Sequence, residues 1–172
     1  MAKIGIIYLS ISGNTTAIAQ WLKELDERIE LYPIKLDESI PKSKLMQVVK
    51  YGYKTIFNRN ISYIFDNEVI DSLDGIIIGA PIWMGRIPSP VRDIISSIDL
   101  KDKCVAGYCT YDGDPGDFKD QLFAFTDSPP FSSFIALKEP LKYLKEENLI
   151  QLKEMVDSIY KTLEDKSMIS KD

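Results

Sequence analysis

Four short runs of almost uninterrupted apolar residues constrain the fold of this chain more than any other feature. They read IGIIYL at 4–9, GIIIGA at 75–80, CVAGYC at 104–109 and FIAL at 134–137. A strand that is apolar on both faces belongs to a sheet covered on both sides, and such sheets are usually parallel. A weaker run, IELYPI at 29–34, predicts an edge strand, because Pro33 cannot donate a hydrogen bond to a neighbouring strand. The chain therefore predicts five strands.

Amphipathic helical patterns lie between these runs. Ile18 and Leu22 share one helix face after the run at 4–9, and Ser89-Pro90 is a favourable helix start after the run at 75–80. Apolar residues that step by three and four predict a further helix over 146–165. Strands that alternate with helices predict an α/β fold, a doubly wound parallel sheet with helices on both faces.

The length of 172 residues suits one domain that spans 1–172. Its unusual part is the long connection 37–73, in which we expect a helix at 44–56 and then a loose connection through Asn58, Arg59 and Asn60. No linker and no internal repeat interrupts the alternation of strands and helices.

Charge and hydropathy exclude several kinds of partner. A net charge of −5 argues against a nucleic-acid or anionic-membrane surface, because either needs a basic footprint. No stretch reaches the roughly 18 uninterrupted apolar residues of a membrane span. The first ten residues, MAKIGIIYLS, show no cleavage site of a signal peptide, so we expect a cytoplasmic protein.

The chain contains no histidine and only two cysteines. The missing histidine excludes Ser-His and Cys-His nucleophile pairs as well as histidine-based metal sites, and two cysteines are too few for a four-thiolate site. Cys104 and Cys109 lie five positions apart in an expected strand, which places them about 16 Å apart on opposite faces. We therefore expect no disulfide between them and no metal site.

The stretch LSISGNTT at 9–16 follows the first strand and carries more hydroxyl groups than a turn requires. Together with the N–H groups of the helix that follows, it predicts an anion site. It matches neither the ATPase phosphate loop nor the dinucleotide loop, and no lysine or arginine lies between Leu9 and Gln20. This composition suits holding a phosphate rather than transferring one. A capped turn without a ligand is the alternative interpretation.

Two more loops are expected at the same edge of the sheet, because the carboxyl ends of parallel strands meet there. Trp83, in the loop 81–88, offers a flat stacking surface, and the loop 110–117 adds Tyr111 and three aspartates. Each loop alone is also compatible with ordinary packing or solvation. The three loops together predict a flat aromatic ligand that carries a phosphate.

With these residues in place, the chain resembles the flavodoxin-like FMN-binding proteins. S-I-S-G-N-T at 10–15 is similar to the family's phosphate loop, and D-G-I-I-I-G-A-P-I-W-M-G at 74–85 to the strand and loop that bring an aromatic residue and a flexible glycine to the flavin. The resemblance implies the strand order 2-1-3-4-5 and a peptide at Met84-Gly85 that can flip beside a reduced flavin. It implies FMN as the cofactor, no catalytic side chain, and the following FMN-binding residues: Ser10, Ile11, Ser12, Gly13, Asn14, Thr15, Pro81, Ile82, Trp83, Met84, Gly85, Thr110, Tyr111, Asp112 and Gly113.

Two departures from the electron-carrier pattern keep other functions open. Arg86 follows the second loop's glycine, and the connection 37–73 is longer than short carriers require. The leading hypothesis is an electron-transfer protein with a redox partner protein or a small-molecule acceptor. One alternative is an NAD(P)H-dependent quinone or small-acceptor reductase, and another is a cofactor-free interaction module. A second copy of the chain is a further candidate partner. In a reductase, the following residues would form the wall of a substrate pocket: Lys50, Tyr51, Tyr53, Lys54, Phe57 and Arg59.

Overall fold

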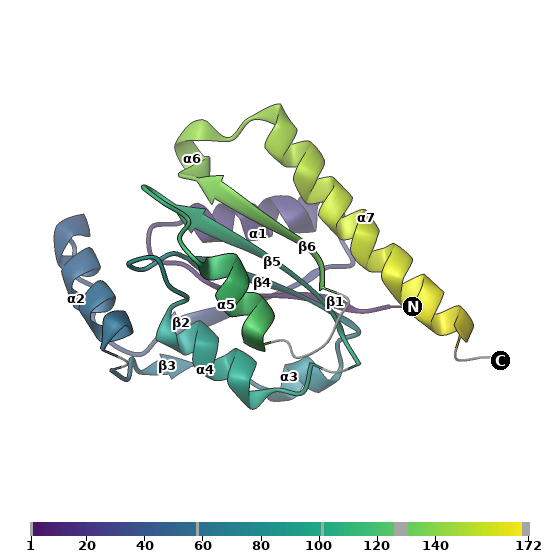
Figure 1. Ribbon diagram of the computed structural model, residues 1–172, viewed down its shortest axis with the longest axis horizontal. Coiled ribbons are helices and arrows are strands. Elements are labelled where there is room, and N and C mark those ends of the chain that lie inside the picture. Colours follow the sequence, from purple (N-terminus) through teal and green to yellow (C-terminus); the bar gives the residue numbers. More distant parts are fainter. Residues whose placement is uncertain (1, 58, 101, 126–130, 170–172) are drawn as a thin grey trace.

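A six-stranded sheet with helices on both faces forms the body of the protein (Figure 1). The computed structural model describes residues 2–57, 59–100, 102–125 and 131–169. The strands are β1 (Ile4–Leu9), β2 (Glu30–Leu36), β3 (Tyr63–Ile64), β4 (Gly75–Pro81), β5 (Cys104–Tyr111) and β6 (Phe131–Lys138). The helices are α1 (Asn14–Leu25), α2 (Lys44–Ile56), α3 (Glu68–Asp71), α4 (Ser89–Ser97), α5 (Phe118–Phe125), α6 (Pro140–Tyr143) and α7 (Glu146–Ile169).

Five of the strands form the predicted parallel sheet. Strands β2, β1, β4, β5 and β6 are neighbours in that order, and each adjacent pair is parallel. This confirms the doubly wound α/β fold and the order 2-1-3-4-5 expected for five strands. The change of direction between β1 and β4 places the loops after these two strands side by side, as this topology requires.

The connection between β2 and β4 holds more structure than expected. Its helix, α2, has the predicted bounds, but the expected loose connection continues into β3 and α3. Strand β3 is antiparallel to β2 and pairs with Lys35 and Leu36, beyond Pro33. The five-stranded prediction is thus corrected to six, because a two-residue strand leaves no periodic pattern in a sequence. Asn58, in the same connection, lies outside the described residues.

Two apolar layers form the core, one on each face of the sheet. Helices α1 and α7 cover one face with side chains such as Leu22 and Ile159, and α4 and α5 cover the other with side chains such as Ile94 and Phe118 (Figure 1). The two cysteines are buried, each in a different layer. Among the described residues, no helix has both the length and the apolar character that crossing a membrane demands.

A buried tyrosine connects the sheet to the start of α1. The hydroxyl of Tyr108 on β5 donates a hydrogen bond of 3.0 Å to the Thr15 carbonyl, and burial raises the pKa of this phenol well above its usual value. Gly79 on the neighbouring strand makes room for the ring, because a methyl group at that position would overlap it. This packing fixes the height of the first loop above the sheet.

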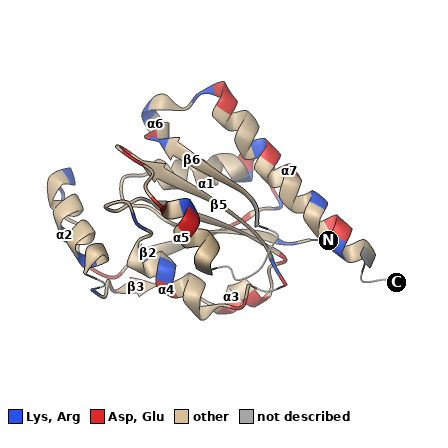
Figure 2. Ribbon diagram, in the orientation of Figure 1, with Lys and Arg blue, Asp and Glu red and all other residues tan. Residues whose placement is uncertain are grey.

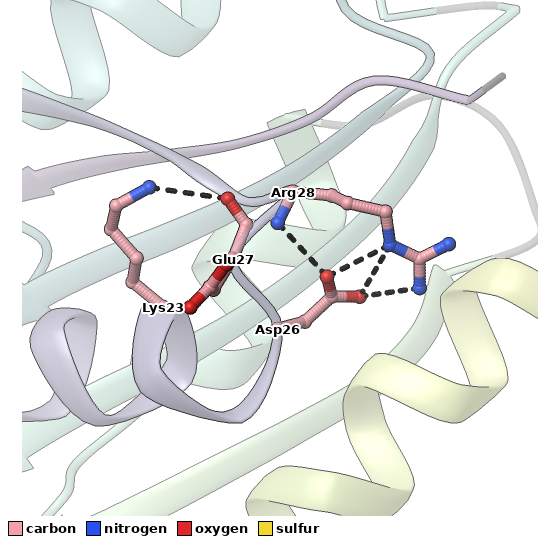
Figure 3. A network of polar contacts seen from close by, with 4 residues as sticks. All are labelled: Lys23, Asp26, Glu27 and Arg28. Carbon is pink, nitrogen blue, oxygen red and sulfur yellow. Dashed lines mark hydrogen bonds and ion pairs between the residues drawn. The ribbon is translucent and has the colours of Figure 1, made fainter.

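Figure 3 shows the corner between α1 and β2, where a short ion pair holds the chain. The Asp26 carboxylate accepts hydrogen bonds from the Arg28 backbone at 2.9 Å and from the Arg28 guanidinium at 2.6 Å and 2.8 Å. Lys23 donates to the carbonyls of Glu27 and Ile29. The Arg28 guanidinium also lies 4.3 Å from the ring centre of Tyr160 on α7. The pKa of Asp26 is held well below its usual range, chiefly by the Arg28 hydrogen bond.

Candidate functional site

A cavity of about 680 Å³ opens at the carboxyl ends of β1, β4 and β5. Its walls bring together the three loops that the sequence singled out, and one side of helix α2. Twelve of the predicted site residues line it: Ile11, Ser12, Asn14, Pro81, Ile82, Trp83, Met84, Gly85, Thr110, Tyr111, Asp112 and Gly113. Ser10, Gly13 and Thr15 are not among the lining residues and shape the first loop from behind.

Gly13 and Ser10 set the entry into helix α1. Gly13 has a φ of 89°, a left-handed conformation that glycine adopts without steric cost, and it directly precedes the helix. The Ser10 hydroxyl accepts a hydrogen bond of 3.3 Å from the Thr16 N–H in the first helical turn. Ser10 therefore satisfies one N–H group of the first turn, and Gly13 is the N-cap residue. The first-turn N–H groups and the helix dipole favour an anion at this end of α1.

Thr15 links the first loop to the third. Its side chain is buried, and its hydroxyl lies 2.9 Å from the hydroxyl of Thr110 at the end of β5. Because Tyr108 also contacts the Thr15 carbonyl, β5 holds this residue at two points. The family resemblance implies Thr15 as a phosphate ligand, which stays a prediction; in the structure its contacts hold two loops together.

Asn14 connects the first loop to helix α6. Its amide donates to the Ser12 hydroxyl at 3.1 Å, and its carbonyl oxygen accepts from the Leu141 N–H in α6 at 3.1 Å. Ser12 and Asn14 are thus the polar side chains of this loop that line the cavity. The contribution of Leu141 had no signal in the sequence, because the contact spans 127 residues.

The second loop is a tight turn with an unusual backbone. Trp83 and Arg86 exchange two backbone hydrogen bonds, at 3.1 Å and 3.2 Å, and the two residues between them, Met84 and Gly85, have φ values of 52° and 75°. Positive φ at both central positions is typical of a type I′ turn. Gly85 adopts this conformation freely, whereas Met84 adopts it against a steric preference.

Trp83 is held by an aromatic partner from α2. Its ring stacks on that of Tyr51, with centroids 5.0 Å apart and an angle of 21° between the planes. Tyr51 is buried, and burial raises the pKa of its phenol, so the ring is neutral at physiological pH. Both rings line the cavity, as does Tyr111. The cavity therefore has flat aromatic surfaces next to the polar helix start.

Backbone contact joins the second loop to the third. Gly116 lies so close to Gly85 that a Cβ atom at Gly116 would come within 2.7 Å of the Gly85 Cα and carbonyl oxygen. The side chain of Gln121 in α5 accepts from the Ile87 N–H at 3.1 Å and donates to the Gly85 carbonyl at 3.4 Å. Gln121 orients the second loop, although a lone glutamine in a helix gave no signal of this in the sequence.

Helix α2 forms a fourth wall, which the phosphate-loop resemblance did not include. Lys44, Gln47, Val48 and Tyr51 line the cavity, and their spacing of three and four residues is the helical signal that could have found them. The Lys44 ammonium lies 2.7 Å from the Asp112 carboxylate and so connects α2 to the third loop. The structure places Lys44 in the wall, whereas Arg86 is exposed and is not a lining residue.

The residues proposed for a reductase pocket mostly lie elsewhere. Tyr51 lines the cavity, but Lys50 and Lys54 form ion pairs with Glu38 at 3.4 Å and 2.8 Å. Two others, Tyr53 and Phe57, contact each other at 4.5 Å and are exposed, and so is Arg59. The helix therefore contributes a wall to the cavity with one side only.

No protein-family model matches the sequence, and no curated protein matches it. Solved structures do match. A flavoprotein from Lactobacillus acidophilus, in complex with FMN, has 19% sequence identity and a TM-score of 0.64, over 83% of this chain and 96% of that one.

Two flavodoxins match over a longer part of the chain. The flavodoxin from Streptococcus pneumoniae has 15% identity and a TM-score of 0.60, over 94% of this chain and 99% of that one. Oxidised flavodoxin 2 from Bacillus cereus has 21% identity and a TM-score of 0.59, with the same shares covered. At these identities the likeness concerns the backbone. The chain therefore has the flavodoxin-like fold.

Proposed function

We propose that this protein binds FMN in the cavity above β1, β4 and β5 and transfers electrons through it. One observation carries the proposal: three loops and α2 enclose a single cavity that has a helix N-terminus at one end and aromatic rings beside it. Its volume of about 680 Å³ falls within the roughly 300–1,000 Å³ of small-molecule sites. The proposal is also supported by the Lactobacillus acidophilus flavoprotein, which has a similar backbone and was solved in complex with FMN.

In this proposal the first loop holds the phosphate. Ser12 and Asn14 line the cavity beside the start of α1, so their side chains and the first-turn N–H groups would bind the phosphate oxygens. Ser10, Gly13 and Thr15 keep the loop in shape through the Thr16 N–H hydrogen bond, the left-handed turn and the Thr110 contact. Holding a phosphate by hydroxyls and amides needs no lysine in the loop.

The isoalloxazine would lie against the second and third loops. Trp83, Tyr111 and the turn at Met84-Gly85 line this part of the cavity. FMN supplies one- and two-electron redox chemistry when bound, so the protein needs only to bind it, orient it and shield it from water. Asp112 is already paired with Lys44, which reduces the negative charge that a reduced flavin would meet.

The test is a titration of the purified chain with FMN and, separately, with riboflavin, followed by flavin fluorescence. FMN should bind at least about tenfold more tightly than riboflavin, because only FMN has the phosphate that the first loop is proposed to hold. Absence of FMN binding would contradict the proposal and favour the cofactor-free module. Equal binding of both flavins would contradict the role of the first loop.

A second function is favoured by one observation: α2 walls the same cavity with Tyr51 and Val48, so the long connection contributes to the site. This arrangement suits an NAD(P)H-dependent reductase of quinones or other small acceptors. Oxidation of NADPH and NADH by the FMN-loaded protein, measured with and without a quinone, separates the functions. Turnover supports the reductase, and its absence leaves electron transfer to a redox partner protein.

The single-domain organisation and the cytoplasmic location belong to the same proposal. The chain has only two cysteines, buried in different layers of the core, which suits a reducing compartment. Fractionation of cells that produce the native chain tests the location.

A further inference from the structure

We propose that the outer side of α2 is the surface on which two copies of this chain pair. Six apolar side chains form this surface, which we call the outer stripe: Leu45, Met46, Val49, Tyr53, Ile56 and Phe57. At about 100° per residue, they fall within roughly one third of the helix circumference. This inference does not depend on FMN binding.

The outer stripe faces solvent to an unusual extent. Leu45 is 71% exposed, Val49 55%, Tyr53 54% and Phe57 58%. Figure 2 shows α2 at the edge of the molecule, mostly tan, with Lys or Arg in blue towards its two ends and no acidic residue. A single exposed leucine on a helix is ordinary, but a continuous stripe of six apolar side chains is not.

The opposite side of α2, which faces the protein, is the more polar one. It carries Lys50 and Lys54, whose largely buried side chains pair with Glu38. On the same side the hydroxyl oxygens of Tyr51 and Thr55 are buried without a hydrogen-bond partner. A helix on an isolated monomer normally turns its apolar side inward and its charges outward. The reversed arrangement is expected where the outer side is also covered by protein.

The exposed area is that of an interaction surface. The two half-exposed aromatic rings alone expose roughly 200 Å². With the four aliphatic side chains, the stripe exposes roughly 600 Å², the size of a large and often functional patch and most of the ~800 Å² that each partner buries in a standard interface.

The composition of the stripe favours a second copy over other partners. Transient redox complexes bury small areas and rely on complementary charges for steering, and none of the six side chains is charged. Interfaces between identical chains are more apolar than those of non-obligate complexes. An anionic membrane is disfavoured by the net charge of −5. Two α2 helices related by a two-fold axis near Val49 and Tyr53 would bury each stripe against the other.

Pairing at this surface would also shield the cavity. Val48 lines the cavity, is 48% exposed, and directly precedes Val49 of the stripe. A second copy against the stripe therefore lies beside the cavity mouth and excludes water from that side.

Sedimentation velocity of the full-length chain tests the proposal. The expected mass is about 39 kDa, twice the 19.6 kDa of one chain. Val49→Glu should weaken dimerisation by about 100-fold, because it buries two like charges near the two-fold axis. Ile150→Glu, on an equally exposed position of α7, should leave the dimer intact. A wild-type monomer at roughly 100 µM, or a Val49→Glu dimer as tight as wild type, would overturn the proposal.

Two further measurements make the result specific. Val49→Cys should form a disulfide between copies under mild oxidation, whereas Ile150→Cys should not, and the two native cysteines are buried. A wild-type monomer that cosediments with vesicles of phosphatidylcholine and phosphatidylglycerol would overturn the proposal in favour of a membrane surface. Masses are measured with and without FMN: a dimer that binds no FMN contradicts the proposed function alone, and an FMN-binding monomer contradicts this inference alone.

Discussion

At the scale of single residues, the contact between Gly116 and Gly85 couples two loops of the site. A Cβ atom at Gly116 would lie 2.7 Å from the Gly85 backbone, and Gly116 has a positive φ of 54°. We expect Gly116→Ala to displace the second loop and to weaken FMN binding about tenfold, or ~1.4 kcal/mol. Glu24→Ala is the control, because this side chain is exposed on α1 and does not line the cavity. Titration with FMN measures both, and equal affinities would contradict the coupling.

Tyr108 provides a second residue-scale prediction. Tyr108→Phe removes the buried hydrogen bond to the Thr15 carbonyl and keeps the ring that fills the space at Gly79. We expect the free energy of unfolding to fall by about 1 kcal/mol, because the bond is buried and its acceptor loses a partner. Denaturation by urea measures this value. Tyr143→Phe, at an exposed position, should change it little.

Single residues also show how much of the site could be predicted from the sequence. Trp83 and the left-handed Gly13 were predictable, because their chemistry is visible in a few consecutive letters. Gln121 and Lys44 were not, since their roles come from partners 34 or more residues away. Local patterns report what a side chain can do, whereas its distant partners are set by the fold.

At the scale of elements, the corner between α1 and β2 makes stability depend on pH. The pKa of Asp26 is lowered in the folded chain, chiefly by the hydrogen bond from Arg28. A lowered folded pKa stabilises the protein above the unfolded pKa of about 3.9, and this stabilisation is lost as pH falls below it.

We therefore expect Asp26→Asn to lower the melting temperature at pH 7 and to lower it progressively less at pH values below about 4. Thermal unfolding between pH 2 and pH 7 measures both curves. Asp157→Asn, which removes an exposed ion pair with Lys153, should have little effect at any pH. Parallel curves for wild type and Asp26→Asn would contradict the role of this carboxylate.

The elements themselves were largely predictable. The four apolar runs form β1, β4, β5 and β6, because a short run that is apolar on both faces fits a strand in a sheet covered on both sides. Strand β3 and the short helices α3 and α6 were missed, since two to four residues are too few to show a period. The bounds of α2 were right, but which of its sides faces the protein was not readable from its pattern.

At the scale of the whole molecule, the reactivity of the two thiols measures unfolding of the protein. Cys104 and Cys109 are buried in different layers of the core, and burial raises the pKa of Cys109 to about 12. We expect the native chain to react with a thiol reagent such as dithionitrobenzoate only at the rate at which it unfolds. Thiol release, measured against urea concentration, should follow the unfolding transition. Fast reaction of the native protein would contradict this burial.

One rigid helix, α2, carries both a cavity wall and the outer stripe, with Val48 and Val49 adjacent in the chain. Any coupling between two binding events on this helix is reciprocal. If FMN tightens the pairing of two copies by some factor, pairing must tighten FMN by the same factor. The concentration of the protein itself would then regulate its cofactor occupancy: dilution would release flavin, and accumulation in the cell would retain it.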